Sequence, residues 1–473
     1  MPSETYDIAI IGGGTSVLLL ETRLSEDSNL QVIVLENGED RTADLTALTL
    51  GAWPLLPNSS THWTFYTIPP KDLGRQITTR LGKALGGSRA INSFLLTSTP
   101  KETVGWKSLG NEGWNYATYK VALKRSFTLH KPLGVAEGEG LLQLTLAAPE
   151  SLVRRRPSLA IRTGTTTTKV LLERSSSADN SDGASETIGV LKEVVISAGP
   201  INSLRLLELL GISGVDILEM DVLVDNPHVG EKSISTSSLN AFFRQEPDVV
   251  TTAMRDYDTR RTGPISMSNM ITMAQLPLPG FHTEDGRKGL DQLLDTLGPD
   301  SEPSEAVGNN VFSPAYVPFN ARSPTYRSPS KFVLVAVELS HLLSCGSVDI
   351  TSAKPEHTGT DEGVSIDCRY LSHPLDLGVL ARQIRFTEDI ISRAEPDFVR
   401  LTADDAYHYT GMCSKMPRTM GRVVGNRLRV YRCSNLRMCG SIVYRAAELG
   451  TTLIKADMLW DRTAFETLYR ACK

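Results

Sequence analysis

The first 36 residues contain the pattern that most restricts the fold. Residues 6–11 (YDIAII) form a compact apolar run of strand type, and three glycines, Gly12 to Gly14, follow it directly. A leucine-rich segment comes next, and a second apolar run at residues 31–35 precedes Glu36. Strand, glycine turn, helix and strand in this order are typical of a βαβ unit that binds a dinucleotide. The alternative is a glycine turn in an ordinary βαβ unit.

The glycines and the acid have distinct roles in such a unit. Gly12 makes the tight turn, and Gly14 lets a pyrophosphate approach the backbone at the helix N-terminus. Glu36, 24 positions after Gly12, has the position of an acid that accepts hydrogen bonds from a ribose. A third glycine, which permits close packing of helix on strand, would fall at position 17, where this chain has Val17. We therefore expect Val17 either to push the helix outward or to be accommodated by a smaller neighbour.

Charge and cysteine content exclude several classes of function. The 473 residues suffice for about three domains. Lys and Arg number 49 against 54 Asp and Glu, a net charge of −5, so we expect no nucleic-acid partner. The six cysteines include no CxxC pair, which favours reduced thiols and no metal site. Four of them follow residue 400, where a disulfide remains an alternative.

The distribution of apolar residues gives no membrane or secretion signal. The longest stretch without a charged side chain, residues 45–70, contains four prolines, whereas a spanning helix needs about 20 mainly apolar residues. Glu4 and Asp7 precede the first apolar run, which has no basic region before it and no plausible cleavage site after it. We therefore expect no membrane partner and a cytoplasmic location.

A second glycine-rich run, residues 80–92 (RLGKALGGSRAIN), resembles the first signature of the glucose-methanol-choline (GMC) oxidoreductases, which are FAD-dependent alcohol oxidases and dehydrogenases. Residues 192–203 (KEVVISAGPINS) are similar to the second signature of that family. Further matches, in the family's order, lie at Trp106 and at residues 109–114, 226–231, 344–348 and the run beginning at Tyr407. The resemblance therefore spans nearly the whole chain.

The resemblance implies an α/β fold (α+β overall) with FAD as cofactor. A Rossmann-like FAD-binding domain, residues 1–235 and 405–473, would carry an inserted antiparallel-sheet substrate-binding domain, residues 236–404. The family's pattern puts the run beginning at Asn92 beside the flavin and Val170 near the adenine. The predicted cofactor-binding residues are Gly12, Gly14, Thr15, Ser16, Glu36, Gly86, Gly87, Asn92, Ser93, Phe94, Leu95 and Val170.

The resemblance also assigns a catalytic residue. His408, in residues 407–414 (YHYTGMCS), matches the family's catalytic histidine. A neutral imidazole, with an ordinary pKa of about 6.5, suits removal of an alcohol proton at cytosolic pH. Relatives usually have a histidine or asparagine about forty residues downstream, where this chain has Gly450. Their acid before the Gly440-Ser441 pair corresponds here to Cys439 or to a one-residue deletion.

Three functional hypotheses follow. The first is an FAD-dependent alcohol dehydrogenase or oxidase that acts on a small neutral alcohol, with oxygen or another electron acceptor, as a tailoring step in secondary metabolism. The second is a redox-impaired relative that acts as a binding or scaffold protein, which Val17, Cys439 and Gly450 together would favour. The third keeps the flavin but uses it for a dehydration or a rearrangement.

Overall fold

The computed structural model describes most of the first 91 residues and parts of the rest of the chain. Besides isolated positions between 251 and 292, it describes residues 4–44, 46, 60–71, 74–91, 111–126, 128–130, 143–145, 156–171, 186–213, 224–225, 272–276, 308–313, 334–339, 342–354, 357, 362–394, 423–425, 427–439 and 451–458.

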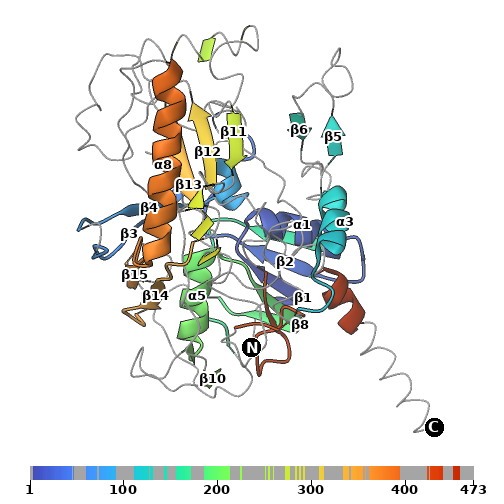
Figure 1. Cartoon of the computed structure of the whole chain (residues 1–473). Helices are drawn as coiled ribbons and strands as arrows, with labels where there is room; N and C mark the ends of the chain where they lie inside the picture. Colours follow the sequence, from blue (N-terminus) through green and yellow to red (C-terminus); the bar gives the residue numbers. More distant parts are fainter. Residues whose placement is uncertain are drawn as a thin grey trace, which may run out of the picture.

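A five-stranded parallel sheet forms the centre of the described structure (Figure 1). Its strands, in spatial order, are β16 (Leu436–Met438), β8 (Ile188–Ile196), β1 (Glu4–Ile11), β2 (Val32–Leu35) and β7 (Leu159–Arg162). Every neighbouring pair is parallel. The sheet therefore combines strands from both ends of the sequence, and the chain reverses direction of winding between β8 and β1.

Two helices follow strands of this sheet. Helix α1 (Thr15–Leu24) connects β1 to β2, and α5 (Pro200–Leu209) follows β8 with Pro200 in its first turn, where the missing N–H costs no hydrogen bond. Helix α3 (Tyr116–Ser126) and the short 3-10 helix η2 (Gly87–Ile91) belong to the same N-terminal part. No helix among the described residues is long and apolar enough to cross a membrane.

The middle of the chain forms a separate antiparallel sheet. Strands β11 (Thr272–Leu276), β12 (Gly308–Ser313) and β13 (Leu334–Leu339) pair in sequence order, and the long helix α8 (Pro374–Ala394) packs against β12 and β13 (Figure 1). This arrangement agrees with the predicted α/β fold that carries an antiparallel sheet. The remaining hairpins and pairs are β3 (His62–Tyr66) with β4 (Thr78–Gly82), β5 (Thr128–His130) with β6 (Gln143–Thr145), β9 (Ile212–Ser213) with β10 (Val224–Asp225), and β14 (Ser347–Ile350) with β15 (Val364–Asp367).

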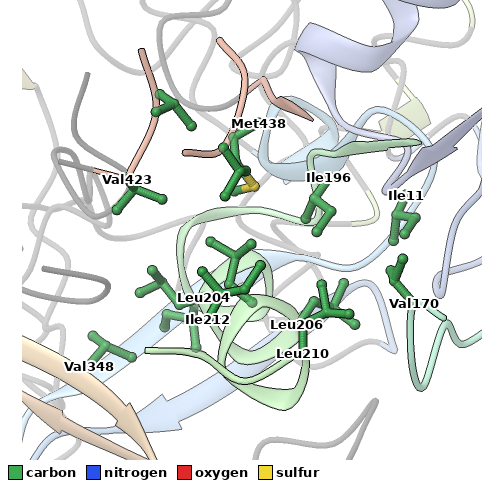
Figure 2. Packing of buried hydrophobic residues seen from close by; sticks show 14 of the residues in the cluster. Ile11, Val170, Ile196, Leu204, Leu206, Leu210, Ile212, Val348, Val423 and Met438 are labelled. Atoms are coloured by element: carbon green, nitrogen blue, oxygen red, sulfur yellow. The ribbon is translucent and has the colours of Figure 1, made fainter. Parts of the chain in front are cut away.

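The two faces of the parallel sheet bury different clusters because successive side chains of a strand point to opposite faces. Ile8 and Ile10 pack with α1 and with helical residues 451–458. Ile11 and Ile196 pack on the other face with α5, as Figure 2 shows. Each face is thus covered by a helix. Because side chains on both faces are buried, residues 8–11 of β1 and all of β2 are apolar without alternation.

Candidate functional site

The first glycine turn lies at the carboxyl edge of the parallel sheet, between β1 and α1. Gly12 has φ +102°, and a Cβ atom at this position would lie 2.3 Å from the carbonyl oxygen of Ser197. Its N–H donates to the carbonyl of Leu35 at 2.8 Å, and Ser197 N–H donates to the carbonyl of Ile11 at 2.8 Å. The turn is therefore held between the ends of β2 and β8, and only glycine fits there.

Glu36 closes this turn from the side of β2. Its Oε2 accepts a hydrogen bond from Gly13 N–H at 2.6 Å, and its Oε1 accepts one from Gly38 N–H at 2.7 Å. The side chain is buried, which raises its pKa, while the N–H groups of Gly38 and Gly13 and the charge of Lys83 act in the opposite direction. The predicted acid therefore lies directly against the glycine turn, at the place where the dinucleotide fold presents an acid to a ribose.

The second glycine run packs directly on the first. Gly86 N–H donates to the carbonyl of Gly13 at 2.8 Å, and Thr15 Oγ1 donates to the carbonyl of Gly86 at 3.4 Å. A Cβ atom on Gly87, which has φ +57°, would lie 2.8 Å from Gly14 Cα. The two runs, about seventy residues apart in the sequence, thus form one surface of closely packed backbone.

The N-terminus of α1 opens onto this surface. Gly14 is the N-cap residue, and a Cβ atom there would find no atom within 4 Å. At the other end of α1, Arg156 donates to the carbonyl of Thr22 and Lys455 to that of Arg23, both at 2.5 Å. The two cations lie at the negative end of the helix dipole. The positive end, at Gly14, is open to an anion.

These observations meet the requirements of a dinucleotide cofactor. The helix N-terminus with open space at Gly14 suits a pyrophosphate, and the buried Glu36 carboxyl suits a ribose. Both lie at the carboxyl edge beside β1, where the winding of the sheet reverses and where ligands of such sheets bind. Among the residues that the structure describes, no cluster of His, Cys, Asp or Glu could hold a metal ion.

Val17 is accommodated in the core, one of the two outcomes expected for it. Its side chain is fully buried, and it belongs to the cluster that contains Ile8, Ile10 and Val195. Cys439, which directly follows β16, is in the same cluster. Helix α1 still begins at Thr15, so the β-branched side chain is buried without displacing the start of the helix.

The other predicted site residues differ in what the structure says of them. Ser16 is buried in the first turn of α1. The side chain of Val170 packs with Ile11 in the α5 cluster (Figure 2), so it serves the core, and only its backbone is left for a contact with a base. The predicted residues that lie outside the described part of the chain are Asn92, Ser93, Phe94, Leu95 and His408, together with Gly450.

Sequence reasoning missed two residues beside Glu36. Gly38 accepts no side chain, because a Cβ atom there would lie 2.2 Å from the carbonyl carbon of Lys83. Lys83 itself holds its Nζ 4.4 Å from the centre of the Trp63 ring. The sequence does contain a hint of both residues, because Lys83 lies inside the glycine-rich run and Gly38 lies two positions after Glu36.

Comparison with known proteins agrees with this geometry. The chain is similar to the GMC oxidoreductase family protein Mala s 12 of Malassezia sympodialis, with 23% identity over 96% of this chain and 93% of that protein. It is 25% identical to a pyranose dehydrogenase of Agaricus xanthodermus, over 96% of this chain and 91% of the relative.

Solved structures share the fold over nearly the full length. A formate oxidase superposes with a TM-score of 0.76 at 18% identity, covering 97% of this chain and 99% of the oxidase. An FAD-dependent oxidoreductase from Chaetomium thermophilum superposes with a TM-score of 0.71 at 20% identity, covering 96% and 99%. These likenesses confirm the predicted Rossmann-like fold.

Family models match both ends of the sequence. The N-terminal model of the GMC oxidoreductases matches residues 6–152, and the C-terminal model matches residues 343–454, so together they cover more than half of the chain. The glycine surface, Glu36 and the open end of α1 lie within the first match. The chain belongs to the GMC oxidoreductase family, and its cofactor is FAD.

Proposed function

We propose that this protein oxidises the CH–OH group of a small, neutral organic alcohol, with His408 as the base. The observation that carries the proposal is the joined surface of the two glycine runs beside the buried Glu36, because it fits a dinucleotide at the edge of the sheet. The names of two relatives, pyranose dehydrogenase and formate oxidase, support an oxidation of a small oxygen-containing molecule.

The described residues would bind and orient the cofactor. The N-terminus of α1 at Gly14 would hold the pyrophosphate through backbone N–H groups, and Glu36 would accept hydrogen bonds from the ribose. Gly87 would let the second run approach without a Cβ atom in the way. When bound, FAD supplies an acceptor for the hydride that leaves the alcohol carbon.

His408 would move the proton. Oxidation of CH–OH to a carbonyl removes a hydride from carbon and a proton from oxygen, and the neutral imidazole ring nitrogen would accept that proton from the hydroxyl group. Gly450 gives no side-chain hydrogen bond at the position of the second polar residue of the family. The loss of one polar partner in a desolvated site costs about 1 to 3 kcal/mol, so we expect a slower reaction than in relatives that keep it.

The scaffold hypothesis has lost part of its support. It rested on Val17, Cys439 and Gly450, and Val17 and Cys439 are now members of one buried cluster at the base of α1. Packing accounts for Val17, because α1 still begins at Thr15, whereas Cys439 and Gly450 keep their place in this hypothesis. A tailoring step in secondary metabolism and a cytoplasmic location stay predictions, as do the domain limits 1–235, 236–404 and 405–473.

A visible absorption spectrum tests the proposal. The purified protein should show bound flavin, and the flavin band should bleach when a substrate alcohol is added without oxygen. The variant His408→Ala should retain the flavin band and lose the bleaching by about two to four powers of ten in rate. A colourless protein that takes up no added FAD would refute the cofactor site, and unchanged bleaching in the variant would refute the role of His408.

A further inference from the structure

We propose that Lys83, held against Trp63, is a positioning residue. Its positive charge favours the ionised form of the Glu36 carboxyl, the form that accepts hydrogen bonds from the cofactor's ribose. The inference rests on the proposed function of Glu36 and extends it to a residue that does not itself line the open end of α1. The loop that follows β2 and contains Gly38 packs against the turn that follows β4 and contains Lys83.

The backbone brings Lys83 to the loop that carries Glu36. Lys83 N–H donates to the carbonyl of Thr61 at 2.7 Å, which fixes the lysine at the end of the β3–β4 hairpin. The backbone of Gly38 approaches Lys83 so closely that a Cβ atom would meet its carbonyl carbon and oxygen at 2.2 Å. Gly38 N–H is in turn one of the two donors to Glu36. Lysine, glycine and acid are therefore joined through a short path of backbone contacts.

Trp63 restrains the lysine side chain. The Nζ atom lies 4.4 Å from the ring centre, within the range of a cation–π interaction. Trp63 is buried and stacks on Phe65 with ring centres 6.2 Å apart, so the indole is a fixed platform. A lysine side chain normally keeps many rotamers, and the cation–π attraction offsets the entropy that is lost when the charge is held in one place.

The charge held there acts on a buried acid. Burial raises the pKa of Glu36, and Lys83 lowers it along with the N–H groups of Gly38 and Gly13. Several charged side chains on the neighbouring elements have partners of their own. Glu39 pairs with Arg41 at 3.7 Å, Arg41 also pairs with Asp44, and Arg162 at the end of β7 pairs with Glu4 at 2.6 Å and with Glu186 at 3.0 Å.

The protonation state of Glu36 decides what it offers a ribose. An ionised carboxylate accepts hydrogen bonds at both oxygens, whereas a protonated carboxyl carries one O–H donor and has less acceptor capacity. Both oxygens already accept one N–H each, so the remaining lone pairs are what the ribose hydroxyls would use. FAD should therefore bind best when Glu36 is ionised, and its affinity should fall as pH drops through the pKa of Glu36.

The pH profile of FAD binding tests this role. The dissociation constant of FAD for the full-length apoprotein is measured by quenching of flavin fluorescence from about pH 5 to about pH 9. In Lys83→Met, which keeps the aliphatic stem, the acidic fall in affinity should move to higher pH, so that FAD binds more weakly than to the wild type at the same acidic pH. Lys83→Arg should keep the wild-type profile.

Combining variants separates the charge effect from packing. Glu36→Gln should bind FAD weakly without the acidic fall, and adding Lys83→Met to it should change little, because the group on which the lysine acts is gone. A wild-type profile in Lys83→Met, or a Met-like profile in Lys83→Arg, would overturn the role of the charge. If the wild-type protein itself fails to quench flavin fluorescence, the cofactor site fails and the inference fails with it; binding with an unshifted profile overturns the inference alone.

Discussion

Glu208 allows a quantitative prediction about stability. It lies on α5 with 2% of its surface exposed, and its Oε2 accepts a hydrogen bond from Ile350 N–H of β14 at 2.8 Å. Burial raises the pKa of Glu208 to about 8; the charge of Asp349 adds to this, while Ile350 N–H and Arg205 oppose it. The folded protein therefore holds Glu208 protonated at neutral pH.

The sign and size of the effect follow from linkage. The unfolded chain releases this proton near the ordinary value of 4.5, and the folded chain holds it to about pH 8. Its contribution to stability is complete below pH 4.5 and is lost as pH rises towards 8. At about 1.4 kcal/mol per pH unit, the free energy of unfolding should fall by about 5 kcal/mol across this window because of Glu208 alone.

Urea denaturation of the wild type and of Glu208→Gln at several pH values checks the prediction. Glutamine keeps the shape and the acceptor for Ile350 N–H but does not ionise, so the variant should gain stability relative to the wild type steadily from about pH 5 to about pH 8. Comparing the two proteins cancels the groups that titrate in both. As a control, Glu208→Leu leaves Ile350 N–H without its acceptor. The Leu variant should therefore be less stable than the Gln variant by about 1 to 3 kcal/mol at every pH. A stability difference between wild type and the Gln variant that does not change with pH would refute the reasoning.

Two further predictions concern the glycine turn and the buried ion pairs. Gly12→Ala should destabilise the fold by about 2 to 4 kcal/mol, because its Cβ would meet Ser197 at 2.3 Å and its φ is +102°. Gly14→Ala is the matched control, because a Cβ there meets no atom within 4 Å. It should leave the melting temperature nearly unchanged and weaken FAD binding at least tenfold. Calorimetry and flavin titration separate the two effects, and equal melting temperatures would contradict the assigned clash. Arg437→Met removes a fully buried cation that pairs with Glu193 at 3.1 Å and with Asp457, and should cost about 3 to 5 kcal/mol in urea denaturation. Adding Glu193→Leu should recover much of that loss; no recovery would show that the cost does not come from the carboxylate left unpaired.

The local unit at the start of the chain was predictable because each of its signals is short in range. Two apolar runs, the glycines and Glu36 lie within 36 residues, and strand period and turn chemistry act over such distances. The structure places Glu36 against Gly13, within this same unit. The fold class followed from the same unit together with the family motifs.

The contacts between distant segments were not predictable in the same way. The packing of Gly87 on Gly14 and the burial of Val17 in one cluster with Cys439 depend on how segments far apart in sequence meet, and no local pattern encodes that. Val170 illustrates the limit well. The family resemblance implies a position near the adenine, which stays a prediction, and the structure adds that the apolar side chain belongs to the core around α5. The cation–π contact of Lys83 likewise requires the β3–β4 hairpin to form first.

The position of β16 has a consequence for how the protein is made. Strand β8 pairs with β1 on one side and with residues 436–438 on the other, and Lys455 binds the end of α1. A ribosome must therefore translate more than nine-tenths of the chain before the parallel sheet can gain its last strand, β16. Until then β8 is an edge strand whose second side has no partner strand, and such an open edge favours association with other chains. Chains that end before residue 436 should accumulate as aggregates or require chaperones, even though every glycine of the cofactor surface is already present in them.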